Sequence, residues 1–213
     1  MEDERLAPPF ITLLASGGHT AIIHTKTETE FEVLGGTLDD AAGEAFDKVA
    51  RILSLPYPGG PHVEALAREG KNCIPLPKML KGNGGYDFSY SGLKTAVLNY
   101  CHTKEQRGEE YNRADVAASF QSAALDILVQ KTIEGAREKN VKTVTAGGGV
   151  VANGYLREKL KAACDKERLK LILPEKRHCT DNAAMIAAEG LLQYRAGNFA
   201  PLTLNAEASI PLR

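Results

Sequence analysis

Two glycine-rich segments could bring backbone N–H groups close to a bound ligand. Ser16-Gly17-Gly18-His19-Thr20 lies between two apolar runs, and Gly147-Gly148-Gly149 follows an apolar run and precedes Asn153. Because glycine has no Cβ, such backbone can approach phosphate or sugar, and consecutive N–H groups can surround an anion beside the Ser16 and Thr20 hydroxyls. The alternative for the first segment is an ordinary hairpin turn, which the segment taken by itself favours because glycine turns are common. The second could instead approach a neighbouring helix, with Asn153 as a helix cap.

Three carboxylates recur at helical spacing between these segments. Asp40, Glu44 and Asp47 occupy positions i, i+4 and i+7, so on a helix they share one face. Gly43 borders this face and leaves room for a close approach. Stacked carboxylates repel one another, and a metal ion, a ribose or an ammonium group would relieve that repulsion. The alternative is a solvated acidic face with Asp39 or Asp40 as the N-cap.

A candidate metal ligand stands at the start of the last expected helix. Cys179-Thr180-Asp181-Asn182 offers either an N-cap, Thr180 or Asp181, or a metal-binding carboxylate at Asp181. His178 and Cys179 are potential ligands as well, but near-consecutive residues rarely converge on one ion. A lone aspartate therefore needs partner ligands from elsewhere in the chain.

Two further segments carry weaker signals. Tyr57-Pro58-Gly59-Gly60-Pro61 predicts a rigid turn with exposed backbone. Phe88-Ser89-Tyr90-Ser91-Gly92-Leu93-Lys94 brings hydroxyls and a cation to a helix start, where they could contact RNA phosphate. A capped helix start explains the same residues.

Composition narrows the function classes. The 213 residues carry a net charge of -1, so no global basic field indicates nucleic-acid binding. Tryptophan is absent and aromatic residues make up 6%, which argues against a broad stacking platform for single-stranded RNA. The four cysteines match no structural zinc spacing, and no apolar run is long enough to span a membrane. We therefore expect a cytoplasmic protein with free thiols.

The expected elements predict an α/β fold. Strands with an initial hairpin followed by alternating strands and helices imply a mixed sheet with helices on both faces. This order resembles a ribonuclease-H-like lobe of the actin, Hsp70 and sugar-kinase (ASKHA) superfamily with a helical insertion. We expect a first part of the lobe at residues 1–54, the insertion at 55–113 and the remainder at 114–213. Strands are expected at residues 10–15, 20–25, 31–34, 141–145 and 169–173, and helices at 39–53, 62–68, 92–100, 114–139, 153–168 and 181–195.

Six motifs stand in a fixed order along the chain: SGGHT, DDAAGEAFDK, YPGGP, FSYSGLKTAV, GGGVVAN and CTDNAAMIA. Together they resemble the tRNA N6-adenosine threonylcarbamoyltransferase family, which is also known by the older names O-sialoglycoprotein endopeptidase and glycoprotease. The resemblance runs from about Pro8 to the C-terminal residues. It implies transfer of threonylcarbamoyl from threonylcarbamoyl-AMP to the adenosine 3′ of the anticodon in tRNAs that read ANN codons.

The resemblance implies ligand-binding roles and assigns no catalytic side chain. The residues 14–18 would hold the adenylate phosphates, Asp47 with Glu44 would contact the ribose, and the remaining residues would line the nucleotide pocket. Asp181 would ligate one divalent metal, iron or zinc, which would polarise the carbonyl. The implied nucleotide-binding residues are Leu14, Ala15, Ser16, Gly17, Gly18, Glu44, Asp47, Gly60, Gly148 and Asn153.

One departure from the family pattern matters for activity. Family members carry two metal-binding histidines in an HxxxH motif upstream of SGGHT, whereas the fifteen residues before Ser16 contain no histidine. We expect the first lobe to be missing and the metal site to be incomplete. Half a cleft should bind ligand weakly and leave apolar surface exposed. We therefore expect ATP or threonylcarbamoyl-AMP as ligand, inactivity of the chain alone, and self-association through the uncovered surface.

Three alternatives remain. A zinc glycoprotease would need clustered ligands and a general base, as in HExxH, and the five histidines are scattered. A non-catalytic binding subunit would match the family's silent paralogue, although GGGVVAN and CTDNAAMIA favour the catalytic member. A sugar or acetate kinase would share only the superfamily. By resemblance to bacterial members, the expected partners are tRNA, the silent paralogue and a small ATPase subunit, with no membrane.

Overall fold

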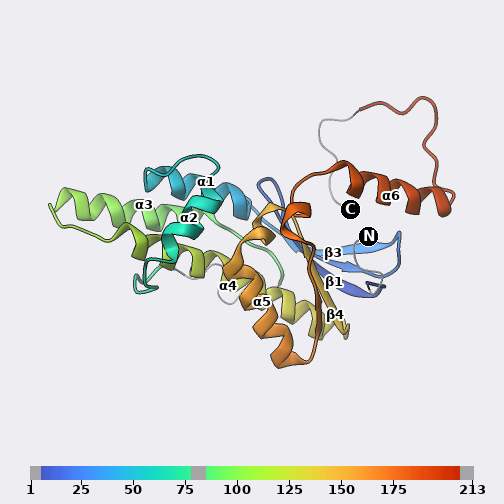
Figure 1. Ribbon diagram of the computed structural model, residues 1–213, viewed down its shortest axis with the longest axis horizontal. Helices are drawn as coiled ribbons and strands as arrows, with labels where there is room; N and C mark the ends of the chain where they lie inside the picture. Colours follow the sequence, from blue (N-terminus) through green and yellow to red (C-terminus); the bar gives the residue numbers. More distant parts are fainter. Residues whose placement is uncertain (1–5, 78–84, 207–213) are drawn as a thin grey trace.

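The computed structural model describes residues 6–77 and 85–206, which form a mixed five-stranded sheet with helices around it (Figure 1). The strands are β1 (Phe10–Ala15), β2 (Thr20–Thr25), β3 (Phe31–Gly36), β4 (Thr143–Gly147) and β5 (Lys170–Ile172). Their spatial order is β3-β2-β1-β4-β5. β1 and β2 pair antiparallel, as do β2 and β3, whereas β4 pairs parallel with both β1 and β5. This confirms the predicted mixed sheet.

The described residues also form α-helices and two short 3₁₀ helices. The α-helices are α1 (Ala42–Ile52), α2 (Gly59–Ala67), α3 (Ser91–Gln106), α4 (Arg113–Glu138), α5 (Gly154–Glu167) and α6 (Ala183–Arg195). Two short 3₁₀ helices that the sequence did not predict are η1 (Gly149–Ala152) and η2 (Lys176–His178).

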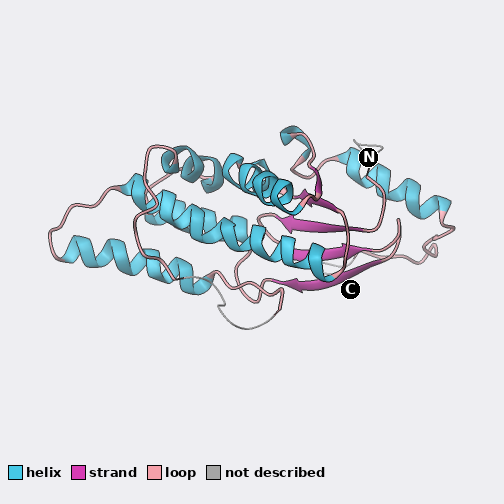
Figure 2. Cartoon of the chain, turned by 90° about the horizontal axis from the view of Figure 1, so that it is seen from below, coloured by secondary structure: helices cyan, strands magenta, loops and turns pink. Residues whose placement is uncertain are grey.

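The sheet separates two helical layers (Figures 1 and 2). Alternate residues of β1 point to opposite faces, as in any strand. Ile11 and Leu13 are fully buried and belong to the core that α4 closes, together with Leu125 and Leu128. α6 lies over the other face and buries none of its own side chains. The core therefore sits between the sheet and α4, and it extends outward to α1, α2 and α3.

Several predicted boundaries were wrong. α2 begins at Gly59 instead of residue 62, so Gly59, Gly60 and Pro61 form the first turn of a helix where the YPGGP motif predicted a rigid turn. α1 begins at Ala42 instead of residue 39, because residues before it are held by the segment that leads into α3. Asp39 Oδ1 accepts a hydrogen bond from the Tyr90 N–H at 2.7 Å. β4 begins two residues late, because Val141 N–H donates to Ala136 O at 3.0 Å and closes the end of α4. α3 ends at Gln106, whereas the sequence predicted an end at residue 100.

The FSYSGLK segment has a structural role. Phe88 and Tyr90 are fully buried, and the Tyr90 hydroxyl donates to Ala124 O at 3.2 Å. α3 starts without a side-chain cap, so the predicted capped start is wrong. Lys94, expected to be available to RNA phosphate, lies 3.6 Å from Asp40 Oδ2. The segment therefore fastens the start of α1 to the core. Within residues 6–77 and 85–206, no helix has both the length and the apolarity that a membrane crossing would need.

Candidate functional site: a glycine-lined face

The parallel pairing of β1 with β4 brings the two glycine segments together. Leu14 is the partner of Gly147 in this register, so both strands end at the same edge of the sheet. Carboxyl ends of parallel strands are where α/β folds commonly bind ligands. We call the backbone surface formed there by Gly17, Gly18 and Gly147 the glycine-lined face.

The turn between β1 and β2 is held by its own serine. Ser16 N–H donates to His19 O at 2.8 Å, and Ser16 Oγ accepts from His19 N–H at 2.9 Å and from Gly18 N–H at 3.3 Å. The Thr20 hydroxyl, expected near a bound anion, accepts instead from Ala42 N–H at 2.8 Å. In this state the predicted anion nest is therefore partly occupied by internal hydrogen bonds.

Gly43 allows α1 to dock on this turn. A Cβ on Gly43 would lie 2.8 Å from Ser16 O and 2.9 Å from Gly17 N, and Gly43 N–H donates to Ser16 O at 3.0 Å. The close approach that the sequence suggested at Gly43 is thus an approach of the turn itself. It aims the positive end of the α1 dipole at the turn.

Gly148 joins the second glycine segment to the first. Its φ of +100° lies in a region that favours glycine, and a Cβ there would lie 2.3 Å from Ala15 O. Ala15 itself is fully buried, and Leu14 is half-buried in the strand. Leu14 and Ala15 therefore contribute to the site through their backbone. Gly148 packs against the carbonyl group of Ala15.

Other glycines in the region face open space. A Cβ on Gly17, Gly18, Gly60 or Gly147 would meet nothing within 4 Å, and one on Gly149 would meet only Thr180 Cγ2 at 3.8 Å. Packing therefore does not require glycine at these positions, because a Cβ would fit without a clash. Such positions are where a ligand could lie against backbone.

The acidic residues of α1 already have partners. Lys48 Nζ lies 2.6 Å from Asp40 Oδ1 and 2.8 Å from Glu44 Oε1, and hydrogen bonds to these two carboxylates raise the pKa of Lys48. Asp40 precedes α1 instead of standing on its face. Lys48 was missed by sequence reasoning, although its i+4 spacing from Glu44 is a recognisable ion-pair signal. Lys94, whose Nζ lies 3.6 Å from Asp40 Oδ2, is remote from Asp40 in sequence, so no spacing pattern indicates this contact.

Asp47 links α1 to the start of α2. Its Oδ1 accepts a hydrogen bond from Gly59 N–H at 2.7 Å, which places a carboxylate at the positive end of the α2 dipole. A Cβ on Gly59 would lie 2.5 Å from Ala50 Cβ, so the two helices touch there. One carboxylate oxygen of Asp47 is thus used structurally.

Asn153 caps a helix. Its Oδ1 accepts from Leu156 N–H at 3.1 Å, and its Nδ2 donates to Gln121 Oε1 at 2.9 Å. Only 7% of the residue is exposed. The cap interpretation is confirmed, and the Asn153 side chain links the start of α5 to Gln121 of α4. Gln121 was not singled out from the sequence, because nothing in its helical context indicates this contact.

Asp181 is exposed and lies just before α6, whose N-cap is Asn182. The predicted cap at Thr180 or Asp181 was therefore wrong by one or two residues. In the part of the chain that the structure describes, no group of three His, Cys, Asp or Glu side chains could hold a metal ion. Cys179 is buried, and its thiol donates to Glu175 O at 3.6 Å. One carboxylate alone does not fit a catalytic metal, which takes three protein ligands.

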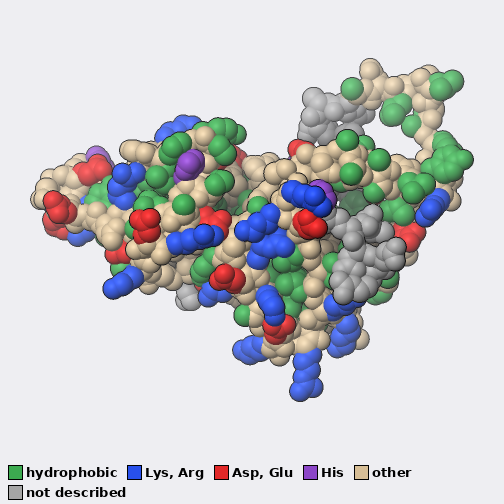
Figure 3. Space-filling view, in the orientation of Figure 1, with side chains coloured by type: hydrophobic (Ala, Val, Ile, Leu, Met, Phe, Trp, Pro, Cys, Tyr) green, Lys and Arg blue, Asp and Glu red, His purple; other side chains and the backbone are tan. Residues whose placement is uncertain are grey.

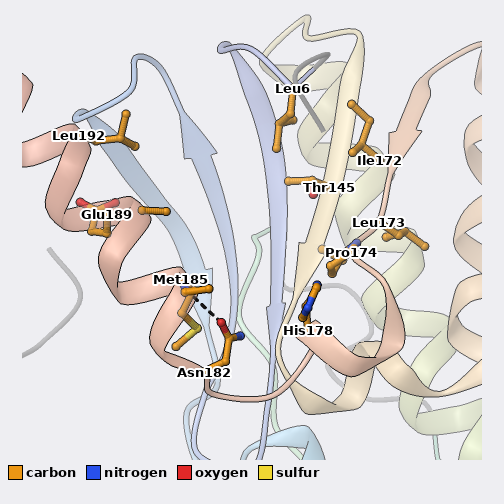
Figure 4. Close-up of a pocket in the computed structure, with 13 residues that line it drawn as sticks. Leu6, Thr145, Ile172, Leu173, Pro174, His178, Asn182, Met185, Glu189 and Leu192 are labelled. Atoms are coloured by element: carbon orange, nitrogen blue, oxygen red, sulfur yellow. Dashed lines mark hydrogen bonds between the residues drawn. The ribbon is translucent and has the colours of Figure 1, made fainter. Parts of the chain in front are cut away.

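A cavity of about 540 Å³ lies elsewhere, between the sheet and α6 (Figure 4). Leu6, Ile172 and Met185 lie around it, and Asn182 Oδ1 accepts from Met185 N–H at 3.0 Å. His178 points toward it from η2. No residue of the glycine-lined face borders this cavity. The candidate site is therefore the open backbone surface of the glycine-lined face and not this apolar cavity.

Solved structures share the fold. Full-length HypF in a phosphate- and nucleotide-bound form aligns with a TM-score of 0.67 at 14% identity, over 91% of this chain and 40% of that chain. HypF from T. kodakarensis aligns with a TM-score of 0.57 at 20% identity, over 80% and 21%. These likenesses show the fold alone, and together with the strand order they support the predicted α/β, ASKHA-like fold.

Sequence comparisons identify the family. The family model for tRNA N6-adenosine threonylcarbamoyltransferase matches residues 1–188. Curated relatives of that name are 50% identical over 205 residues in Moorella thermoacetica and 51% identical over 208 residues in Geobacillus kaustophilus. Each alignment covers 96% of this chain and 60% of the relative. The chain belongs to the tRNA N6-adenosine threonylcarbamoyltransferase family and spans about 60% of the length of these relatives.

Proposed function

We propose that this chain supplies the nucleotide-facing half of a threonylcarbamoyl transfer site. The reaction would move the threonylcarbamoyl group from threonylcarbamoyl-AMP to the adenosine 3′ of the anticodon in tRNAs reading ANN codons. The exocyclic amine would attack the carbonyl carbon, the bond to the phosphate oxygen would break, and AMP would leave as the amine loses a proton. The chain's own task is to bind and orient the adenylate.

The observation that carries this proposal is the contrast between packed and open glycines. Gly43 and Gly148 bring α1 and the β4 turn against the β1–β2 turn, while Gly17, Gly18 and Gly147 leave empty space at the same edge of the sheet. A surface built this way exposes backbone to a ligand without side-chain obstruction. It suits the polar phosphate and ribose of an adenylate better than a deep apolar pocket would.

The remaining assignments belong to the same proposal. Glu44 and the second carboxylate oxygen of Asp47 would meet the ribose hydroxyls. A divalent metal, iron or zinc, would require ligands beyond Asp181. Without such ligands and without the opposing wall of a cleft, the chain alone would be inactive.

The assembly we propose follows from the same family. Besides tRNA, the partners would be the silent paralogue and the small ATPase subunit of the bacterial system, in the cytoplasm. The chain alone would self-associate through apolar side chains on and after α6. The exposed ones are Met185, Ile186, Leu191, Tyr194, Phe199, Leu202 and Leu204.

A steric substitution tests the glycine-lined face. Gly17→Leu adds a side chain where the fold has room, so it should leave the chain folded but fill the ligand's place. Gly190→Leu, in the exposed middle of α6, is the matched control because a Cβ there also meets nothing within 4 Å. Calorimetry would measure the binding of ATP with magnesium. The chain would be mixed with the part of the Moorella thermoacetica relative that lies outside the alignment.

We expect Gly17→Leu to weaken binding at least about tenfold, which corresponds to about 1.4 kcal/mol, and Gly190→Leu to leave it unchanged. Equal affinity of both variants and the unmodified chain would contradict the proposal.

A further inference from the structure

Positive charge is concentrated in one part of a chain that is nearly neutral. Residues 139–178 contain ten Lys and Arg residues and four Asp and Glu residues, while the whole chain has 26 and 27. The remaining residues are therefore strongly acidic on balance. Such an asymmetry within one protein points to a polyanionic partner for the basic part.

The fold places this charge along one edge of the sheet. β5 is an edge strand that pairs only with β4, and basic residues stand before and after it. Figure 3 shows Lys and Arg side chains from the region of η2 down to the end of α5 and the strands beside it. We call this surface the basic edge. Its exposed members are Lys142, Lys166, Arg168, Lys170, Lys176 and Arg177.

Part of the charge of the basic edge is paired, because Arg177 Nε lies 2.8 Å from Glu175 Oε2. In the described part of the chain, no carboxylate lies within ion-pair distance of Lys142, Lys166 or Arg168. Glu167, the nearest acidic neighbour in sequence, is engaged by Arg137 of α4. Since the Debye length is roughly 8 Å at physiological salt, cations grouped in this way act together on a nearby anion.

The basic edge lacks the features of a protein interface. Protein interfaces centre on aromatic or aliphatic anchors. Among the described residues from 139 to 180, no large hydrophobic side chain is exposed. Charge without apolar anchors fits contacts to a phosphate backbone, which are independent of nucleotide sequence.

The basic edge runs along the whole length of β5. Lys142 and Arg168 precede β4 and β5 at the amino ends of the strands, whereas Lys176 and Arg177 follow β5 on the side of the glycine-lined face. β5 runs parallel to β4, and η2 follows it and packs against η1, directly after the Gly147–Gly149 turn. Thr180 Cγ2 lies 3.8 Å from the place of a Cβ on Gly149. A strand of RNA that runs from Lys142 and Arg168 along β5 to Lys176 would therefore reach the candidate site.

We propose that the basic edge binds the phosphate backbone of RNA, independently of sequence, and holds a tRNA so that one of its nucleotides reaches the glycine-lined face. The choice of tRNA rests on the proposed function. The phosphate contact itself rests on the charge, exposure and placement of Lys142, Lys166 and Arg168.

Charge reversal tests this surface. One variant combines Lys142→Glu, Lys166→Glu and Arg168→Glu. The matched control reverses three exposed cations elsewhere, Arg51→Glu, Lys71→Glu and Arg195→Glu, with the same change in net charge. Filter binding of a tRNA transcript and of a scrambled RNA would be measured over a salt series, after circular dichroism has shown that both variants are folded.

We expect the edge variant to bind both RNAs at least about tenfold more weakly at low salt and the control to stay within about twofold of the unmodified chain. The slope of log affinity against log salt should fall by about two, since each lost phosphate contact contributes roughly 0.7 to 0.9. Equal affinities of the edge and control variants would overturn the proposal. Tighter binding of polyglutamate than of RNA would overturn it as well.

The test is separable from that of the proposed function. ATP binding to the same variants, measured as for Gly17→Leu, should be unchanged by the edge substitutions. If ATP never binds but RNA binding still depends on the edge, the proposed function fails and the basic edge stands.

Discussion

At the scale of residues, the glycines divide into two groups by what surrounds them. Gly148 has backbone within 2.3 Å of the place of its Cβ, whereas Gly147 has nothing within 4 Å. The first glycine is therefore required by the fold, and the second is available to a ligand. Sequence alone cannot separate them, because GGG carries no information about which residue takes the positive φ.

Stability measurements can separate these neighbours. Gly148→Ala should lower the free energy of unfolding by about 2 kcal/mol or more, because alanine is strained at this φ and its Cβ would press on Ala15 O. Gly147→Ala should change it by less than about 0.5 kcal/mol. Urea denaturation of both variants gives the comparison, and equal losses would refute this division of the glycines.

Asp47 offers a second residue-scale prediction. Asp47→Ala removes the acceptor for Gly59 N–H at the start of α2 and should cost about 1 kcal/mol of stability. Asp47→Asn keeps a side-chain oxygen and should cost less than half as much. Denaturant midpoints check this order. If alanine and asparagine behave alike, the bond from Gly59 contributes little.

The same pair separates structure from ligand binding. A ribose contact through the second carboxylate oxygen should make Asp47→Asn weaken ATP binding although the variant keeps most of its stability. Calorimetry on the mixture described for Gly17→Leu measures the affinity of the Asp47→Asn variant for ATP.

At the scale of elements, local patterns predicted most of the fold. The β1–β2 hairpin has the predicted bounds, 10–15 and 20–25, since a glycine turn between two apolar runs needs no distant partner. The start of α1 was wrong because Tyr90 holds Asp39 from a distant segment. One of the two lysines near Asp40 is Lys94, which is also remote in sequence. Contacts of this kind leave no periodic signal in a single sequence.

α6 differs from the other long helices in how it packs. It buries none of its side chains, whereas α4 buries residues on several sides and lies under β1, β2 and β4. Few buried contacts mean a low free energy of local opening. Amide hydrogen exchange by mass spectrometry should therefore show α6 exchanging well before the centre of α4. Equal protection of the two helices from exchange would contradict this prediction.

At the scale of the whole molecule, one lobe presents two surfaces of different chemistry. The glycine-lined face is backbone, and the basic edge is lysine and arginine. Family membership could be predicted from the six ordered motifs, but the geometry of the face could not. It depends on the parallel pairing of Leu14 with Gly147, which joins strands far apart in sequence.

The central claim is that an adenylate lies against the glycine-lined face, and backbone NMR tests it most directly. The ¹⁵N-labelled chain, mixed with the additional segment of the relative, would be titrated with ATP and magnesium. We expect the amide signals of Gly17, Gly18 and Gly147 to shift together and to saturate at one affinity. Shifts confined to residues around the α6 cavity, such as Met185 and Ala188, with the three glycines unmoved, would contradict it.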